Sequence, residues 1–106
     1  MVKLSEIKYF ARVIAREFAP DKIILFGSHA TGKAREASDV DLLVLLPFKG
    51  KGCRKALEIL ERVHPPFPLD LVLRTPEAFE ERIRQGDFFL REIADEGIVL
   101  YEGAHA

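Results

Sequence analysis

The chain has 106 residues, of which 48% are hydrophobic and 31% charged, and its formal net charge is −1. These values predict one soluble globular domain over residues 1–106, without a signal peptide or a membrane anchor, because no apolar run approaches the roughly 18 residues that span a bilayer. A single cysteine excludes an internal disulfide and favours a reducing, cytoplasmic setting, and the near-neutral charge argues against general nucleic-acid binding.

The distribution of polar residues is less even than the totals. Residues 1–56 hold eleven Lys or Arg and six Asp or Glu, whereas residues 57–106 hold five and eleven. This asymmetry predicts an anionic ligand on the first half or a charged partner surface, unless the halves interleave in the fold. The chain also has no Asn and one Gln, which together with its many charges is typical of heat-adapted proteins.

The first half predicts two helices and two strands. Apolar residues at helical spacing indicate a helix over residues 5–18, with Ser5 as its cap. The apolar run 22–26 predicts a buried strand that turns at Gly27-Ser28, and a short helix follows the turn. Residues 39–46 are nearly all apolar after the first three and predict a central strand covered on both faces.

The second half continues the alternation of helices and strands. Its patterns predict a helix over 56–63, a strand over 67–73, a helix after Thr75, a helix over 88–96 and a strand over 98–101. Thr75 and Asp87 are the expected caps, and Gly97 suits a left-handed helix end. The predicted fold is an α/β (α+β) domain with a small mixed sheet of three or four strands flanked by helices.

One aromatic pair in the second half has two interpretations. Phe88 and Phe89 share the helical spacing of Ile93, which favours a place in the core. The alternative is an exposed contact with a partner protein.

Asp39 and Asp41 interrupt the most apolar stretch of the chain. Side chains two residues apart on a strand point to the same face, roughly 6.5–7 Å apart, so both carboxylates can reach one point. A carboxylate in apolar surroundings needs a compensating cation, and Mg²⁺ prefers oxygen ligands. The alternatives are an ordinary turn acid for Asp39 and a buried salt bridge to an arginine for Asp41.

Asp70 repeats this pattern in the next predicted strand. If that strand pairs with residues 39–46, Asp70 completes a cluster of three carboxylates on one face of the sheet. A polar residue near the start of a strand is the simpler interpretation.

The Gly27-Ser28 turn presents backbone N–H groups and a hydroxyl to an anion. Gly27, Gly32 and Lys33 have the spacing of a phosphate-binding P-loop, but Ala34 replaces the hydroxyl residue that such a loop requires. The turn is therefore not a P-loop.

Taken together, Gly27-Ser28, ten intervening residues and Asp39-Val40-Asp41 resemble the G-S-x10-D-x-D motif of the DNA polymerase β-like nucleotidyltransferase superfamily. The short chain is similar to the minimal, MNT-type branch. The resemblance implies that Gly27 and Ser28 bind the nucleotide, that Asp39 and Asp41 are catalytic and bind Mg²⁺, and that Asp70 is the third acid. Many members of that superfamily have arginines in the loop after Gly-Ser, where this chain has His29, Ala30 and Thr31, and this departure leaves the substrate range open.

The resemblance also implies an activity. The expected reaction is the Mg²⁺-dependent transfer of a nucleoside monophosphate, AMP from ATP, to an acceptor, with two metal ions. For a chain this short the resemblance implies a helical HEPN-type toxin as partner and acceptor, with this chain as its antitoxin. The alternatives are an antitoxin that acts by binding alone and a nucleotidyltransferase for a small-molecule acceptor.

Overall fold

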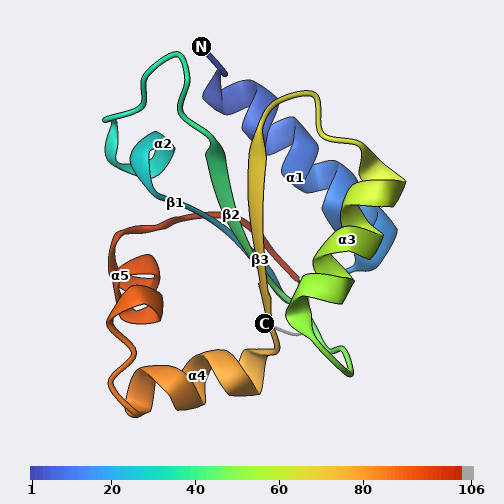
Figure 1. Cartoon of the computed structure of the whole chain (residues 1–106), viewed down its shortest axis with the longest axis vertical. Coiled ribbons are helices and arrows are strands. Elements are labelled where there is room, and N and C mark those ends of the chain that lie inside the picture. Colours follow the sequence, from blue (N-terminus) through green and yellow to red (C-terminus); the bar gives the residue numbers. More distant parts are fainter. Residues whose placement is uncertain (104–106) are drawn as a thin grey trace.

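The computed structural model describes residues 1–103, which form five helices and four strands (Figure 1). In chain order these are α1 (Leu4–Phe18), β1 (Lys22–Phe26), α2 (Ser28–Thr31), β2 (Val40–Leu45), α3 (Gly52–Val63), β3 (Leu69–Arg74), α4 (Pro76–Arg84), α5 (Phe88–Glu96) and β4 (Ile98–Glu102). The predicted order of elements is confirmed, and the strand ends differ from the predicted ones by at most two residues.

The four strands form one mixed sheet in the order β3-β2-β1-β4. β2 and β3 run parallel, and β1 runs antiparallel to both of its neighbours. Helices α1 and α3 cover one face of the sheet, and α4 and α5 lie on the other (Figure 1). The predicted α/β domain with a small mixed sheet is confirmed.

β2 lies inside the sheet and is apolar on both faces. Val40, Leu42 and Val44 pack in the larger core beneath α1 and α3. Leu43 and Leu45 pack in a smaller core with Leu90 of α5. Burial on both sides explains why this strand is a nearly continuous apolar run, as predicted.

Two of the predicted helix caps are confirmed and one is wrong. The side chains of Thr75 and Asp87 accept hydrogen bonds from the N–H groups of Ala78 (3.1 Å) and Leu90 (3.0 Å). Ser5, by contrast, lies inside the first turn of α1, and Lys3 is the N-cap. The N–H of Lys3 donates to the Glu6 carboxylate (3.1 Å), which satisfies the helix start without a hydroxyl.

Gly97 ends α5, but the prediction of a left-handed conformation is wrong, because its φ is −70° and β4 begins at the next residue. Its lack of a side chain has another cause. A Cβ at this position would overlap a methyl group of Ile24 and the carbonyl oxygen of Ile93. Gly97 therefore lets the end of α5 pack closely against β1.

The core assignment of the aromatic pair is also wrong. Ile93 is buried as predicted, but Phe88 is 87% exposed and Phe89 is 50% exposed. The buried side of α5 is formed by Leu90 and Ile93, and Phe88, five residues before Ile93, points away from it. Phe89, four residues before Ile93, lies at the margin of this side, where its ring packs edge to face on Phe26 and stays half-exposed.

The two oppositely charged halves of the sequence interleave in space. β4, from the acidic half, pairs with β1, from the basic half, and Lys22 Nζ lies 3.7 Å from Glu102 Oε2 across this pair. Among residues 1–103, no helix is long and apolar enough to cross a membrane.

Candidate active site

The site begins where β1 ends, at a turn that only glycine enters without strain. Gly27 has φ +74°, a conformation that side-chain-bearing residues rarely adopt. The short helix α2 starts at Ser28, and the hydroxyl of Thr31 donates to the Gly27 carbonyl (3.4 Å). The turn is thus held by the helix that follows it.

The carboxylate of Asp41 lies directly against Gly27. The two residues are brought together because Asp41 pairs with Phe26, the last residue of the neighbouring strand β1. A Cβ on Gly27 would overlap Oδ2 of Asp41 and come within 3.2 Å of its Cγ. Glycine is therefore required twice at this position, by its backbone conformation and by the carboxylate beside it.

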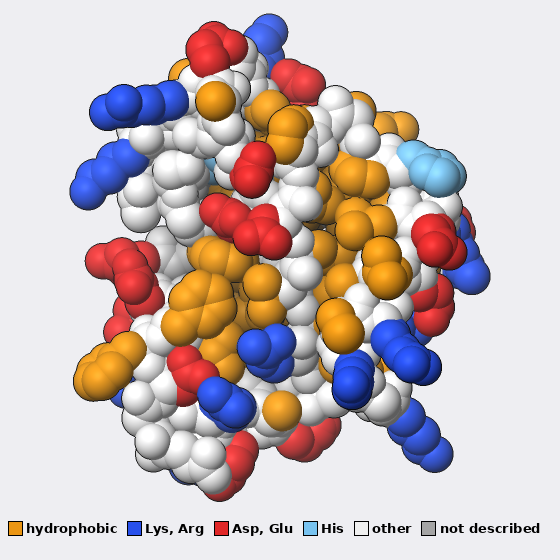
Figure 2. All heavy atoms as spheres, viewed as in Figure 1, with side chains coloured by type: hydrophobic (Ala, Val, Ile, Leu, Met, Phe, Trp, Pro, Cys, Tyr) orange, Lys and Arg blue, Asp and Glu red, His pale blue; other side chains and the backbone are white. Residues whose placement is uncertain are grey.

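Asp70 stands next to Asp41 on the adjacent strand. β2 and β3 are parallel, and Asp41 and Asp70 are register partners. Neighbouring strands are about 4.8 Å apart and register partners share a face. The condition set for bringing these acids together is thus met, because the two aspartate-bearing strands pair, and Figure 2 shows acidic side chains gathered where these strands begin.

Asp39 precedes β2 and is exposed. The N–H of Val40 donates to the carbonyl of Pro68 (2.9 Å), which fixes this entry beside the start of β3. Asp39 also acts electrostatically on Asp41. The three aspartates selected from the sequence therefore lie at one end of the sheet.

The pKa of Asp41 is raised above its ordinary value. The main cause is partial burial, and the charges of Asp70 and Asp39 add to it. A positive charge on His29 acts in the opposite direction. The surroundings of Asp41 therefore disfavour its ionised carboxylate, and a bound cation would favour it.

These carboxylates have no protein partner within residues 1–103. None of the three accepts a hydrogen bond or forms an ion pair with a basic side chain in that range. No charged residue in that range is fully buried. The alternative of a buried salt bridge between Asp41 and an arginine is therefore wrong.

The geometry bears on how a metal would bind. Within residues 1–103, no three Asp, Glu, His or Cys side chains converge enough to hold an ion by themselves. Mg²⁺ usually takes only one or two carboxylates and completes its shell with water and substrate phosphates. Unpartnered oxygen ligands beside a turn open to an anion fit that mode of binding.

His29 is a neighbour that sequence reasoning set aside. It lies in α2, and its Nε2 is 3.3 Å from the carbonyl oxygen of Ser38, just before Asp39. A lone loop histidine carries little signal in a single sequence. Its position depends on how α2 packs against the loop, which no local pattern predicts.

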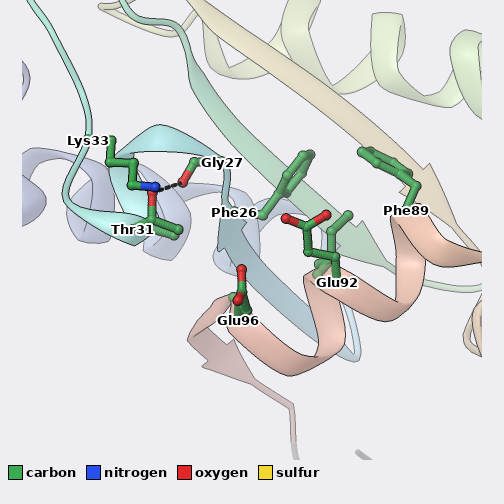
Figure 3. A pocket seen from close by; sticks show the side chains of 10 residues that line it. Phe26, Gly27, Thr31, Lys33, Phe89, Glu92 and Glu96 are labelled. Carbon is green, nitrogen blue, oxygen red and sulfur yellow. Dashed lines mark hydrogen bonds between the residues drawn. The ribbon is translucent and has the colours of Figure 1, made fainter.

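Gly27 also lines a pocket between α2 and α5 (Figure 3). Its volume is about 340 Å³. Its walls carry two phenylalanines, a threonine, a lysine and two glutamates around the glycine: Phe26, Gly27, Thr31, Lys33, Phe89, Glu92 and Glu96. The sequence placed only Gly27 of these in the predicted site, although it also pointed to Lys33 as a basic residue after the turn and to Phe89 as a possible partner contact.

Comparison with known proteins identifies the family of this chain. The model of the nucleotidyltransferase domain family matches residues 7–100 of this chain. No curated protein matches.

Several solved structures share the fold. One is described as a "putative nucleotidyltransferase" from Sulfolobus solfataricus, with TM-score 0.65 and 18% identity over 93% of this chain and 79% of that one. A toxin–antitoxin structure with AMP-PNP has TM-score 0.57 and 20% identity, over 92% and 75% of the two chains. A toxin–antitoxin MntA-HpeT mutant with two Asp-to-Glu substitutions has TM-score 0.55 and 16% identity, over the same shares.

Proposed function

Because this chain belongs to the nucleotidyltransferase domain family, we propose that it transfers a nucleoside monophosphate, AMP from ATP, to an acceptor hydroxyl in a Mg²⁺-dependent reaction. The observation that carries the proposal is the end of the sheet where Asp41 packs against Gly27 and pairs with Asp70. This arrangement places unpartnered carboxylates beside a turn suited to phosphate. Family membership supports the reaction class, and the position of these residues supports their assignment to the site.

Each residue of the site has a distinct role in this proposal. Gly27 and Ser28 hold the triphosphate, because a glycine turn lets phosphate oxygens approach backbone N–H groups closely. Asp39 and Asp41 hold Mg²⁺, with Asp70 as a third ligand or as proton acceptor. Bound Mg²⁺, expected as two ions, neutralises charge on the phosphates and orients them.

The proposed step conserves atoms and charge. The acceptor oxygen forms a bond to the α-phosphorus of ATP, and the bond from that phosphorus to the bridging oxygen breaks. Pyrophosphate leaves with the bonding electron pair. The proton of the acceptor hydroxyl moves to an oxygen of Asp70, which is exposed and free of a protein partner within the described chain.

The proposed acceptor is a second protein. Two structures with this fold come from toxin–antitoxin pairs, one of them with AMP-PNP. We therefore propose that the chain is an antitoxin, and that the acceptor is a helical toxin of the HEPN type. The exposed Asp70 leaves this side of the site open to such an acceptor.

Labelled ATP tests the proposal in vitro. The chain, the product of the adjacent reading frame and Mg²⁺ are incubated with ATP labelled at the α- or the γ-phosphate. We expect the α-label on the partner protein and the γ-label in released pyrophosphate. A partner that stays unlabelled but is still neutralised would identify an antitoxin that acts by binding alone, and a label on small molecules only would identify a different acceptor class.

A further inference from the structure

The pocket between α2 and α5 has the chemistry of a nucleobase site. It starts at Gly27, the residue that also contacts Asp41, yet neither Asp41 nor Asp70 lines it. The pocket and the carboxylate of Asp41 therefore both border Gly27, and the pocket does not include the carboxylates. A ligand whose phosphates rest on the turn has its next part within reach of this pocket.

The aromatic side chains give the pocket a surface for a flat ring. Phe26 and Phe89 meet edge to face, with centroids 5.6 Å apart and planes at 86°. This contact fixes the orientation of Phe89, which is half-exposed on the surface of α5. A preoriented, accessible phenylalanine ring can stack on any nucleobase, because every base has a π-face.

The polar groups are divided between the two walls. Lys33, on the α2 side, is a donor, whereas Glu92 and Glu96, on the α5 side, only accept hydrogen bonds (Figure 3). The hydroxyl of Thr31 already donates to the Gly27 carbonyl. Glu92 and Glu96 have no ion-pair partner within residues 1–103. A ligand that is anionic at one end and carries N–H donors at the other matches this division, whereas Lys33 opposes a purely cationic ligand.

We propose that this pocket binds the base of the nucleoside triphosphate and selects bases with an exocyclic amino group. The base stacks on Phe89, and its amino group donates to Glu92 or Glu96. Lys33 lies on the side of the sugar and phosphates. The inference rests on the proposed function, and it adds a site for base selection that is separate from the carboxylates of the reaction.

Equilibrium binding in the absence of Mg²⁺ tests this without any transfer step. ATP is compared with purine riboside triphosphate, which lacks only the amino group, and with UTP. We expect the wild-type chain to bind ATP about tenfold more tightly than either, because a hydrogen bond to a charged acceptor is lost. In Glu92→Ala/Glu96→Ala the preference falls below about twofold, whereas the exposed α4 variant Glu80→Ala keeps it.

Phe89→Ala separates stacking from amino-group recognition. It should weaken ATP and purine riboside triphosphate by the same factor, roughly tenfold, because both rings stack. Equal binding of ATP and the analogue by the wild-type chain would overturn the inference, as would an unchanged preference in the double glutamate variant. Either result leaves the proposed function intact if Asp41-dependent labelling of the partner persists, whereas selective binding without labelling would contradict the proposed function alone.

Discussion

Two aspartates show how differently this molecule treats a carboxylate. Asp87 caps α5: it accepts from the N–H of Leu90 and from Nε of Arg82, both at 3.0 Å, and its pKa is lowered, mainly by the hydrogen bond from Leu90. Asp41 has no such partner within the described chain, and partial burial raises its pKa. The carboxylate of Asp87 therefore stabilises the fold, whereas the unpartnered carboxylate of Asp41 is available to a ligand and lowers the free energy of unfolding when it is ionised.

The largest expected effect of changing Asp41 is on the transfer activity. Asp41→Asn removes a negative charge that would hold the metal, and we expect transfer of the α-label to fall by about 10³-fold or more. Asp95→Asn, the same change on the surface of α5, should leave transfer within about twofold. Comparable rates for wild type and Asp41→Asn in a partner-labelling assay would remove Asp41 from the reaction.

The contact between Asp41 and Gly27 gives the second test. Gly27→Ala and Gly32→Ala both place a side chain at a positive φ, +74° and +78°, but ψ is −155° at Gly27, in a region nearly restricted to glycine, and 14° at Gly32, in the left-handed helical region. Each change should therefore cost about 1–3 kcal/mol of strain. Only at Gly27 would the new Cβ overlap Asp41, since nothing lies within 4 Å at Gly32.

We expect Gly27→Ala to unfold at least about 4 °C below Gly32→Ala in a thermal melt, and to lose activity that Gly32→Ala retains. Equal melting temperatures and equal activities would show that the contact between Gly27 and Asp41 affects neither stability nor activity.

Asp87 predicts a moderate effect on stability that depends on pH. Asp87→Ala removes the cap of α5 and should lower Tm by roughly 3–8 °C at pH 7. Because the pKa of Asp87 is lowered in the folded chain, its contribution is present above the ordinary value of 3.8 and is lost as pH falls through the folded pKa. The Tm difference between wild type and variant should therefore shrink in acid.

Thr75→Ala is the matched control for that experiment, because it removes the other side-chain cap without removing a titrating group. Its effect on Tm should stay constant with pH. Parallel pH profiles for the two variants would contradict the role assigned to the Asp87 charge.

The smallest expected effect has the opposite sign. Since the pKa of Asp41 is raised, the free energy of unfolding falls as pH rises from 3.8 through the folded pKa. Asp41→Asn should therefore raise Tm by about 2–4 °C at pH 7 without metal. Millimolar Mg²⁺ with ATP should stabilise wild type more than the variant, and a lower Tm for the variant without metal would contradict the assignment.

The sequence and the structure agree most closely where the signals are local. Apolar periodicity located the helices and strands, and the capping roles of Thr75 and Asp87 follow from one hydroxyl or carboxylate at a helix start. Asp39, Asp41 and Asp70 stood out because acids in apolar strands have a desolvation cost. Parallel pairing of β2 and β3 then brought two of them into register.

The remaining features depend on packing between distant elements. Gly97 was assigned to a helix end by its residue type, whereas its reason is the side chain of Ile24 beneath it. Phe89 and Glu92 line a pocket only because α5 crosses β1 beside α2. No periodicity within α5 contains that information, so its exposed phenylalanines were placed in the core.

The mass of the partner protein tests the central claim most directly. The product of the adjacent reading frame is co-expressed with the wild-type chain or with Asp41→Asn, and its intact mass is measured after purification. The account predicts a mass increase of one or more nucleoside monophosphate groups with wild type and none with the variant. The same partner mass in both preparations would contradict it.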